Sequence, residues 1–333
     1  MKKIPDTERF TLLHGDALRE LASLEDESVH AAITDPPYGL TPSIDIEELL
    51  QSWLSGTTFV NDRNGYGSAE WDNSVPGPEL WREVYRLLVP GGFVLAFASA
   101  RTIDLTTLAL RLAGFDIRDL IHWVYAPGRP SQDQGKVAVE LNDPELARAV
   151  AGYRPTLRPG HEPIVVARKP FDEPGVTVLD NLYDYGVGAI NHGAITGAPA
   201  AIATNVWVVH DLACSPECCH CEVGETGAAQ HGTHLYPGQT LPDRGLNVPK
   251  PGKSERPVAA DGTTHSTVKP LALMRALIMA FTSAGQVVLD PFAGSGTTIE
   301  ASLLSERRSV GCEMNDEFIP LIMQRVERCT TKK

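Results

Sequence analysis

The sequence lacks the features that mark membrane proteins and secreted proteins. No run of about 18 apolar residues occurs, so no segment is predicted to cross a membrane as a helix. Residues 1–8 contain no apolar core of a signal peptide, which favours a soluble intracellular protein. Four of the six cysteines lie between Cys214 and Cys221, and in a reducing compartment we expect no disulfide bonds.

Positive charge and aromatic side chains are also scarce. The chain has 29 Lys and Arg against 42 Asp and Glu, and this net charge of −13 argues against a protein that coats nucleic acid. Aromatic residues make up 7%, so no extended platform for stacking single strands is visible. Local charge at a groove can still favour DNA. Two basic runs, residues 148–169 and 244–275, fit either a DNA-facing surface or an ordinary solvated one.

The most informative motif that is present is Asp35-Pro36-Pro37-Tyr38. The apolar residues 29–34 before it are predicted to form a buried strand, and open α/β sheets bind ligands where their strands end. The two prolines lack N–H groups and have fixed φ, so their carbonyls and Asp35 offer acceptors beside a flat ring. Such a site suits a planar group with an exocyclic amine. A turn that merely ends the strand is the alternative.

A second motif is the Gly-rich turn of residues 291–298. It follows a predicted buried strand, residues 286–290, and precedes a helical pattern, which is how nucleotide-binding loops are built. No Gly-Lys-Ser/Thr follows, and Ile299 stands where a dinucleotide fingerprint needs glycine. About 20 residues further on, Glu313 ends another predicted strand and can hold two ribose hydroxyls. The pattern therefore suits a nucleoside ligand without a pyrophosphate.

Together the two motifs resemble the signature motifs of the amino-group DNA methyltransferases, which act on adenine N6 or cytosine N4 and use S-adenosylmethionine. Their order in the chain resembles the permuted class called beta. Three further segments resemble family motifs: residues 14–17, 87–92 and 265–270, the last with Ser266 in place of the usual proline. The resemblance covers residues 8–168 and 264–325.

The predicted fold is an α/β fold with a doubly wound, mostly parallel sheet. Seven apolar runs are predicted as strands: 10–14, 29–34, 93–98, 120–125, 163–167, 287–289 and 310–313. Helical patterns cover residues 16–24, 79–88, 105–112 and 271–280, and such alternation favours parallel strands. The resemblance implies a seven-stranded, Rossmann-like methyltransferase sheet in which strands from both chain ends are neighbours.

Two segments do not fit this alternation. The resemblance implies a catalytic domain of residues 1–169 plus 263–333, interrupted by a target-recognition insert at 170–262. The insert has scattered Gly and Pro and little helical period, so a disordered insert is the alternative. A polar loop of residues 41–72 follows the first motif directly, and long loops in such places are functional or mobile.

A cysteine cluster in the insert raises the question of zinc. Cys218 and Cys221 have the C-x₂-C spacing of a zinc knuckle, and His210 and Cys214 could complete four ligands. The spacing departs from common zinc patterns. Free thiols are therefore the favoured interpretation, with zinc as the alternative.

The resemblance implies methyl transfer to adenine N6 in double-stranded DNA, with the target base flipped out and stacked on Tyr38. Asp35 and the Pro36 carbonyl would accept the amine hydrogens, and Pro37 completes the stiff turn. An aspartate as first motif residue favours adenine. Cytosine N4 remains open as a target, and so does an inactive protein that only binds DNA.

For the cofactor, S-adenosylmethionine, the same resemblance implies eight contact residues: Asp16, Thr267, Lys269, Asp290, Phe292, Gly294, Gly296 and Glu313. Glu313 would hold the ribose and Asp16 would lie near the adenine. A cognate restriction endonuclease and a homodimer are left open as further partners, and no membrane partner is expected. The implied place of action is the bacterial cytoplasm, for a bacterial or phage-encoded protein.

Overall fold

The computed structural model of the chain describes residues 9–40, 44–59, 61, 72, 75–124, 132–157, 160–196, 203, 205–208, 221–223, 229–231, 234–236, 239–240, 255–259, 262–265 and 267–330. Among these residues, the helices are too short or too polar to cross a membrane.

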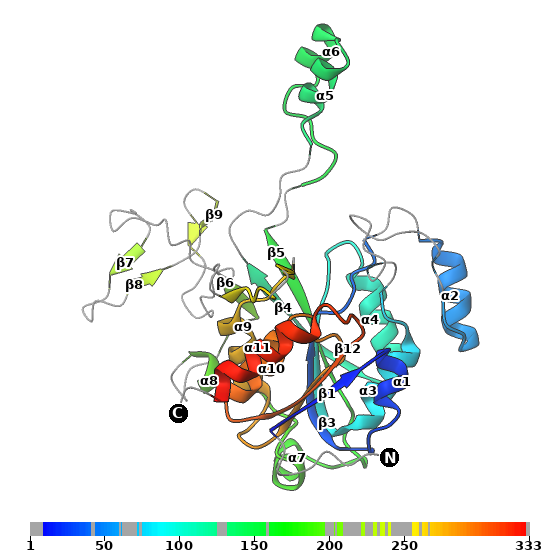
Figure 1. Cartoon of the computed structure of the whole chain (residues 1–333), viewed down its shortest axis with the longest axis vertical. Helices are drawn as coiled ribbons and strands as arrows, with labels where there is room; N and C mark the ends of the chain where they lie inside the picture. Colours follow the sequence, from blue (N-terminus) through cyan, green and yellow to red (C-terminus); the bar gives the residue numbers. More distant parts are fainter. Residues whose placement is uncertain are drawn as a thin grey trace.

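The centre of the described fold is an eight-stranded sheet with the strand order β1-β12-β11-β2-β3-β5-β4-β6 (Figure 1). Its strands are β1 (Phe10–His14), β2 (Val29–Thr34), β3 (Leu88–Phe97), β4 (Asp116–Val124), β5 (His161–Arg168), β6 (Val206–Val208), β11 (Val287–Asp290) and β12 (Arg308–Glu313). Neighbours pair in parallel except at β5, which runs antiparallel to both β3 and β4. The C-terminal strands β12 and β11 therefore lie between the N-terminal strands β1 and β2.

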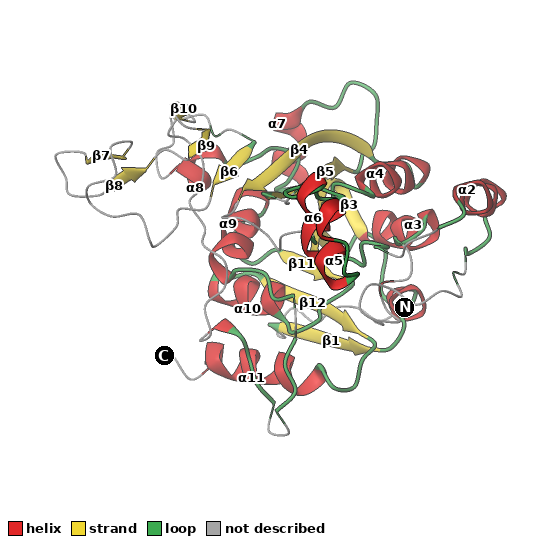
Figure 2. Cartoon of the chain, turned by 90° about the horizontal axis from the view of Figure 1, so that it is seen from above, coloured by secondary structure: helices red, strands yellow, loops and turns green. Residues whose placement is uncertain are grey.

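Helices cover both faces of this sheet (Figure 2). They are α1 (Ala17–Leu21), α2 (Ile46–Ser55), α3 (Pro78–Leu87), α4 (Ile103–Leu112), α5 (Gln134–Glu140), α6 (Pro144–Ala149), α7 (Val178–Tyr185), α8 (His192–Thr196), α9 (Leu271–Phe281), α10 (Thr297–Leu304) and α11 (Ile319–Thr330). Helices α1, α3 and α4 lie on one side, and α9, α10 and α11 lie on the other. The result is the three-layer architecture expected when strands and helices alternate.

The period of two in the strands decides which side chains meet which helix layer. In β2, Ala32 is fully buried on the face of α1 and α3, whereas Ala31 and Ile33 are fully buried on the face of α9. Both faces of β2 are thus covered, which explains why its sequence is a continuous apolar run rather than an alternating one.

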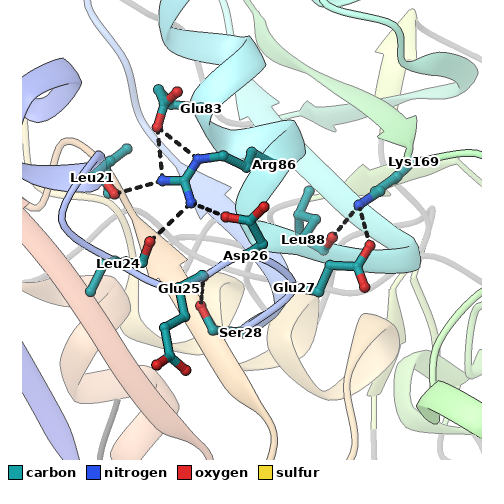
Figure 3. A network of polar contacts seen from close by, with 10 residues as sticks. All are labelled: Leu21, Leu24, Glu25, Asp26, Glu27, Ser28, Glu83, Arg86, Leu88 and Lys169. Atoms are coloured by element: carbon teal, nitrogen blue, oxygen red, sulfur yellow. Dashed lines mark hydrogen bonds and ion pairs between the residues drawn. The ribbon is translucent and has the colours of Figure 1, made fainter. Parts of the chain in front are cut away.

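At the edge where β2 and β3 begin, Arg86 ties two helices together (Figure 3). Its guanidinium donates to the carbonyl oxygen of Leu21 at the end of α1, at 3.0 Å, and to that of Leu24 just after α1, at 2.9 Å. It also pairs with Glu83 one turn earlier on α3, at 2.8 Å. These bonds satisfy carbonyls that the end of a helix leaves without partners.

At the same edge, the buried Lys169 donates to Leu88 O at 2.7 Å and to Glu27 at 3.0 Å (Figure 3). This edge lies opposite the carboxyl ends of the parallel strands. The contacts of Arg86 and Lys169 therefore stabilise the edge where the strands begin, and the candidate site lies at the opposite edge.

The seven strands and the mostly parallel sheet predicted from the sequence are confirmed, and β6 adds a short eighth strand at the sheet margin. One local difference concerns residues 87–92. Helix α3 ends at Leu87, and β3 starts at once and runs through Pro90, Gly91 and Gly92 with a shift in its register against β2. Gly91 has φ of +76°, and a Cβ there would lie 2.2 Å from the Asn181 amide nitrogen, so only glycine fits.

The first part of residues 170–262, the segment predicted as an insert, packs against the sheet and its helices. Asn181 of α7 is buried and donates from its amide to Pro90 O at 3.0 Å and to Val187 O at 2.8 Å. Helix α8 packs against α9. Two separate pairs of short strands follow: β7 (Cys221–Val223) with β8 (Ala229–His231), and β9 (His234–Tyr236) with β10 (Gln239–Thr240).

Candidate active site

The Asp35-Pro36-Pro37-Tyr38 turn leaves β2 at the carboxyl edge of the sheet. Because Pro36 and Pro37 have no N–H, the next backbone donors after Asp35 are those of Tyr38 and Gly39. Both donate to one oxygen of Asp72, at 2.7 and 2.8 Å. Asp72 is 4% exposed, and it connects the far end of the loop that follows the motif to the motif itself.

Thr102 fixes the same turn from α4. Its hydroxyl donates to the carbonyl oxygen of Tyr38 at 2.7 Å. The backbone of Tyr38 is therefore held on both sides, by Asp72 at its N–H and by Thr102 at its carbonyl. A turn anchored in this way can present a ring and a carboxylate in fixed positions.

Four side chains close a ring of polar contacts at this turn. The Tyr38 hydroxyl donates to Asp35 Oδ1 at 2.7 Å and lies 3.3 Å from Glu162 Oε2. The Lys269 ammonium binds Asp35 Oδ2 and lies 3.3 Å from Glu162 Oε2. Two carboxylates thus share one phenol and one ammonium. Lys269 also lies 5.5 Å from the centre of the Tyr38 ring and 5.1 Å from that of Phe97.

Burial and charge act on this ring in known directions. Burial alone would lower the pKa of Lys269, but Asp35 and Glu162 outweigh it, and the pKa of Lys269 is raised. Burial and the same two carboxylates raise the pKa of Tyr38 well above its usual value. Near neutral pH, Lys269 is therefore charged and Tyr38 keeps its proton to donate.

The Gly-rich loop lies between β11 and α10, and Glu313 at the end of β12 holds it. Glu313 accepts from the N–H of Gly294 at 2.7 Å with one oxygen and from that of Asn315 at 2.8 Å with the other. Gly294 has φ of +51°, and a Cβ there would lie 3.1 Å from His265 Nε2. Gly296 has φ of +80° and begins α10. The loop therefore needs glycine for its backbone conformation and for close approach.

Asp290 connects the loop to the first motif. It is 3% exposed, and its Oδ1 accepts from the Thr34 hydroxyl at 2.7 Å and from the N–H of Phe292 at 3.1 Å. Burial raises the pKa of Asp290 to about 6, even though Thr298, Thr34 and Phe292 bond to its ionised form. Because Thr34 immediately precedes Asp35, this one bond joins the two sequence motifs.

The remaining predicted contact residues lie around the same edge. Asp16 follows β1 and caps α1 by accepting from the N–H of Arg19 at 3.2 Å, and β1 pairs with β12 so that His14 is opposite Glu313. Thr267 is exposed, and its N–H donates to His265 Nδ1 at 3.3 Å. Lys269 lies with Asp35 and Glu162, so its predicted place near the amino-acid end of the cofactor stays a prediction.

Two residues of the site escaped sequence reasoning. Glu162 is at the start of β5, and because this strand is antiparallel, its first residues reach the edge where β2 and β3 end. In the sequence, Glu162 was only an acidic residue at the start of a predicted strand. Its place in the site follows once the direction of β5 is known. Asp72 lies beyond a long loop, 34 positions after Tyr38, and its contact could not be read from local pattern.

The candidate zinc ligands, the alternative to free thiols, fall mostly outside the described residues. His210, Cys214 and Cys218 lie outside the described residues, and of Cys221 only the backbone in β7 is described. Within the described part of the chain, no three His, Cys, Asp or Glu side chains form a cluster that could hold a metal ion. The choice between zinc and free thiols stays a prediction.

The strand order, the single antiparallel strand β5 and the loop at the end of β11 define an α/β protein with a nucleoside-type loop beside a second polar site. The sequence matches the model of the family described as DNA methylase over residues 29–324. This span covers most of the chain, and the protein belongs to the DNA methylase family. Its enzymes modify amino groups of bases, and the family includes adenine-N6 and cytosine-N4 enzymes.

Individual relatives agree with this assignment. The chain is 28% identical to Type II methyltransferase M.HindIII of Haemophilus influenzae, covering 95% of this chain and 94% of the relative. It is 26% identical to DNA adenine methyltransferase YhdJ of Escherichia coli, covering 96% and 83%.

Two solved structures share the fold. PvuII DNA methyltransferase, a cytosine-N4-specific enzyme, matches with a TM-score of 0.52 and 16% identity, covering 98% of this chain and 93% of that one. A protein from Thermus thermophilus described as a DNA modification methylase, crystallised with S-adenosyl-L-methionine, matches with a TM-score of 0.50 and 21% identity, covering 97% and 96%. These likenesses concern the fold.

Proposed function

We propose that the protein transfers a methyl group from S-adenosylmethionine to adenine N6 in double-stranded DNA. The observation that carries the proposal is the bond between Thr34 and Asp290, at 2.7 Å. It holds the ends of β2 and β11 together, so the Asp35–Tyr38 turn and the Gly-rich loop open at the same edge of the sheet. A target amine at the turn would then lie next to a methyl donor at the loop.

The chemistry of the loop region fits S-adenosylmethionine. Positive φ at Gly294 and Gly296 keeps the loop free of side chains that would block a nucleoside. Each oxygen of Glu313 accepts one backbone N–H and retains a lone pair for a ribose hydroxyl. Asp290 and Asp16 add acidic charge, which suits a cation. When bound, S-adenosylmethionine supplies a methyl group attached to a sulfonium sulfur, and this sulfur is a good leaving group.

The turn would prepare the target amine. Tyr38 stacks on the flipped base, and its ring is oriented by the hydroxyl contact with Asp35. Asp35 and the carbonyl of Pro36 accept hydrogens of the exocyclic amine, whose lone pair is otherwise delocalised into the base. Holding the nitrogen in line with the methyl group converts a bimolecular encounter into a positioned one. We propose residues 170–262 as the region that recognises the DNA target sequence.

Adenine is proposed over cytosine because the first motif residue is an aspartate, which mostly accompanies adenine in the family that the sequence resembles. The relative YhdJ is a DNA adenine methyltransferase by name, whereas PvuII methyltransferase is cytosine-N4-specific. Cytosine N4 is therefore the second candidate.

The test is expression in a bacterium that lacks DNA methylation. Digested DNA is analysed for modified nucleosides by mass spectrometry, with the Asp35→Ala variant as the control for host activity. N6-methyladenine that depends on Asp35 is expected. N4-methylcytosine in its place would make cytosine the target, and unmodified DNA from cells that contain folded protein would contradict methyl transfer to DNA.

A further inference from the structure

Glu162 is a carboxylate of the target site that the mechanism above does not use. It is the second residue of β5, and its side chain is 24% exposed. Its Oε2 faces two donors, the Tyr38 hydroxyl and the Lys269 ammonium, each at 3.3 Å. Both donors also bind Asp35, so Glu162 is connected to the proposed acceptor through two separate side chains.

Asp35 is already engaged at both of its oxygens. Tyr38 donates to Oδ1 and Lys269 binds Oδ2. Each oxygen keeps a further lone pair, so a target amine can bind Asp35 beside these two donors. Lys269 is 8% exposed, and a buried ammonium without a charged partner is strongly unfavourable. Once Asp35 takes the proton of the amine, it is no longer a charged partner of Lys269, which then needs another carboxylate within reach, and Glu162 is that group.

We infer that Glu162 is a positioning residue for methyl transfer: as the second carboxylate of Lys269, it keeps that ammonium paired while Asp35 binds the target amine and takes its proton. The inference rests on the proposed function, because it assigns Asp35 to the amine. Glu162 acts through Lys269 and touches neither substrate nor cofactor in this account.

Charge accounting through the step supports this role. The amine nitrogen forms the C–N bond with its lone pair, while the C–S bond breaks and its electron pair stays on sulfur. Asp35 accepts the N–H proton that the methylated nitrogen loses. Asp35 is then neutral and no longer a counter-ion for Lys269. Glu162 stays beside Lys269 at 3.3 Å, so the buried ammonium keeps a carboxylate partner before, during and after transfer.

The experiment compares wild-type protein with Glu162→Gln, which keeps the size of the side chain but removes its charge. Labelled S-adenosylmethionine and genomic DNA from a methylation-free bacterium give single-turnover transfer rates, and calorimetry gives cofactor affinity. The E162Q rate is expected to fall about ten-fold or more while cofactor affinity stays within about three-fold, the pattern of an interaction that matters for transfer.

Glu27→Gln is the matched control. Glu27 is likewise the carboxylate partner of a buried lysine, Lys169, at 3.0 Å, but it lies at the opposite edge of the sheet (Figure 3). It should transfer at the wild-type rate. If Glu27→Gln lost as much of its transfer rate as E162Q, buried lysine–carboxylate pairs would affect the rate through the fold in general. That result would overturn the positioning role of Glu162.

Two further readouts separate positioning from structure. Without the Glu162 charge, the pKa of Lys269 should fall. Raising the pH from about 7 to about 9 should then release Asp35 and recover part of the E162Q rate, with no such recovery in wild type. On a Lys269→Gln background, E162Q should cause no further loss.

The outcomes are distinct. If E162Q transfers at the wild-type rate, or if its loss is independent of pH and persists on the Lys269→Gln background, Glu162 does not act through Lys269. Should E162Q fail to bind cofactor, Glu162→Asp replaces it: this variant keeps the charge and should keep the wild-type dependence on pH, and a recovery at high pH would overturn the role. No transfer by wild-type protein would instead contradict the proposed function itself.

Discussion

Asp35 differs from the other acids of the site because a side chain binds each of its oxygens, Tyr38 at Oδ1 and Lys269 at Oδ2. Asp35→Ala removes the proposed acceptor of the amine hydrogen and leaves the Gly-rich loop untouched. We expect methyl transfer to fall by about 100-fold or more, the scale of a lost acid–base group. Cofactor affinity should change only a few-fold. Radiolabel transfer and calorimetry measure the two effects, and turnover near the wild-type level would reject Asp35 as the acceptor.

The raised pKa of the buried Asp290 makes the free energy of unfolding depend on pH. Burial raises the pKa of Asp290 from its usual 3.8 to about 6 in the folded chain, so between these two values the folded state binds more protons. The contribution of Asp290 to stability is therefore lost as the pH rises from about 4 to about 6, and the loss persists above that range.

Asp290→Asn should consequently stabilise the cofactor-free protein at pH 7.5 by about 1–3 kcal/mol, since an amide avoids the cost of a buried charge and can still accept from Thr34. At about pH 4.5 the difference between the two proteins should shrink. Urea unfolding at both pH values checks this. An equal difference at both would show that the hydrogen bonds of Asp290, rather than its charge, dominate.

At the scale of elements, the loop between β2 and α3 is part of the site because its Asp72 clamps the turn. Asp72→Ala would leave the N–H groups of Tyr38 and Gly39 without this acceptor, at a cost of about 1–3 kcal/mol in the free energy of unfolding. Methyl transfer should fall more than cofactor affinity, because Tyr38 and Asp35 share the loosened turn.

The matched variant is Asp72→Asn, which keeps an acceptor oxygen at the same position. It should retain most of the stability and of the transfer rate. Thermal unfolding and single-turnover rates of the two variants give the comparison. If alanine and asparagine behave alike, the clamp does not depend on the accepted hydrogen bonds.

Elements were largely predictable from local pattern, whereas contacts between elements were not. The apolar runs at 29–34 and 287–289 revealed strands because burial on both faces excludes polar residues from them. The positions of Glu162 and Asp72 depend on the direction of β5 and on the return of a long loop. Neither is encoded within a window of neighbouring residues, so the polar ring around Asp35 became visible only in the fold.

At the scale of the whole molecule, the sheet order makes the two chain ends depend on each other. Strand β12 lies between β1 and β11, and β11 lies between β12 and β2. Within the sheet, β1 is therefore connected to β2 only through β12 and β11, the two strands that end at Glu313 and at the Gly-rich loop. We expect one cooperative unfolding transition for the sheet rather than separate transitions for its two parts.

The distribution of tryptophan makes this expectation measurable. All five tryptophans lie at or before Trp207, and Trp53, Trp81 and Trp123 are buried, whereas the Gly-rich loop and Glu313 lie in the C-terminal strands. S-adenosylmethionine at about 100 times its Kd should stabilise the folded state by about 2.7 kcal/mol. Because the sheet unfolds as a unit, tryptophan fluorescence should report this whole shift in urea, although no tryptophan lies near the loop in sequence. Far-UV circular dichroism gives the midpoint of the complete sheet for comparison. A fluorescence midpoint that stays fixed while cofactor binding saturates would mean that the N-terminal strands unfold independently of β11 and β12.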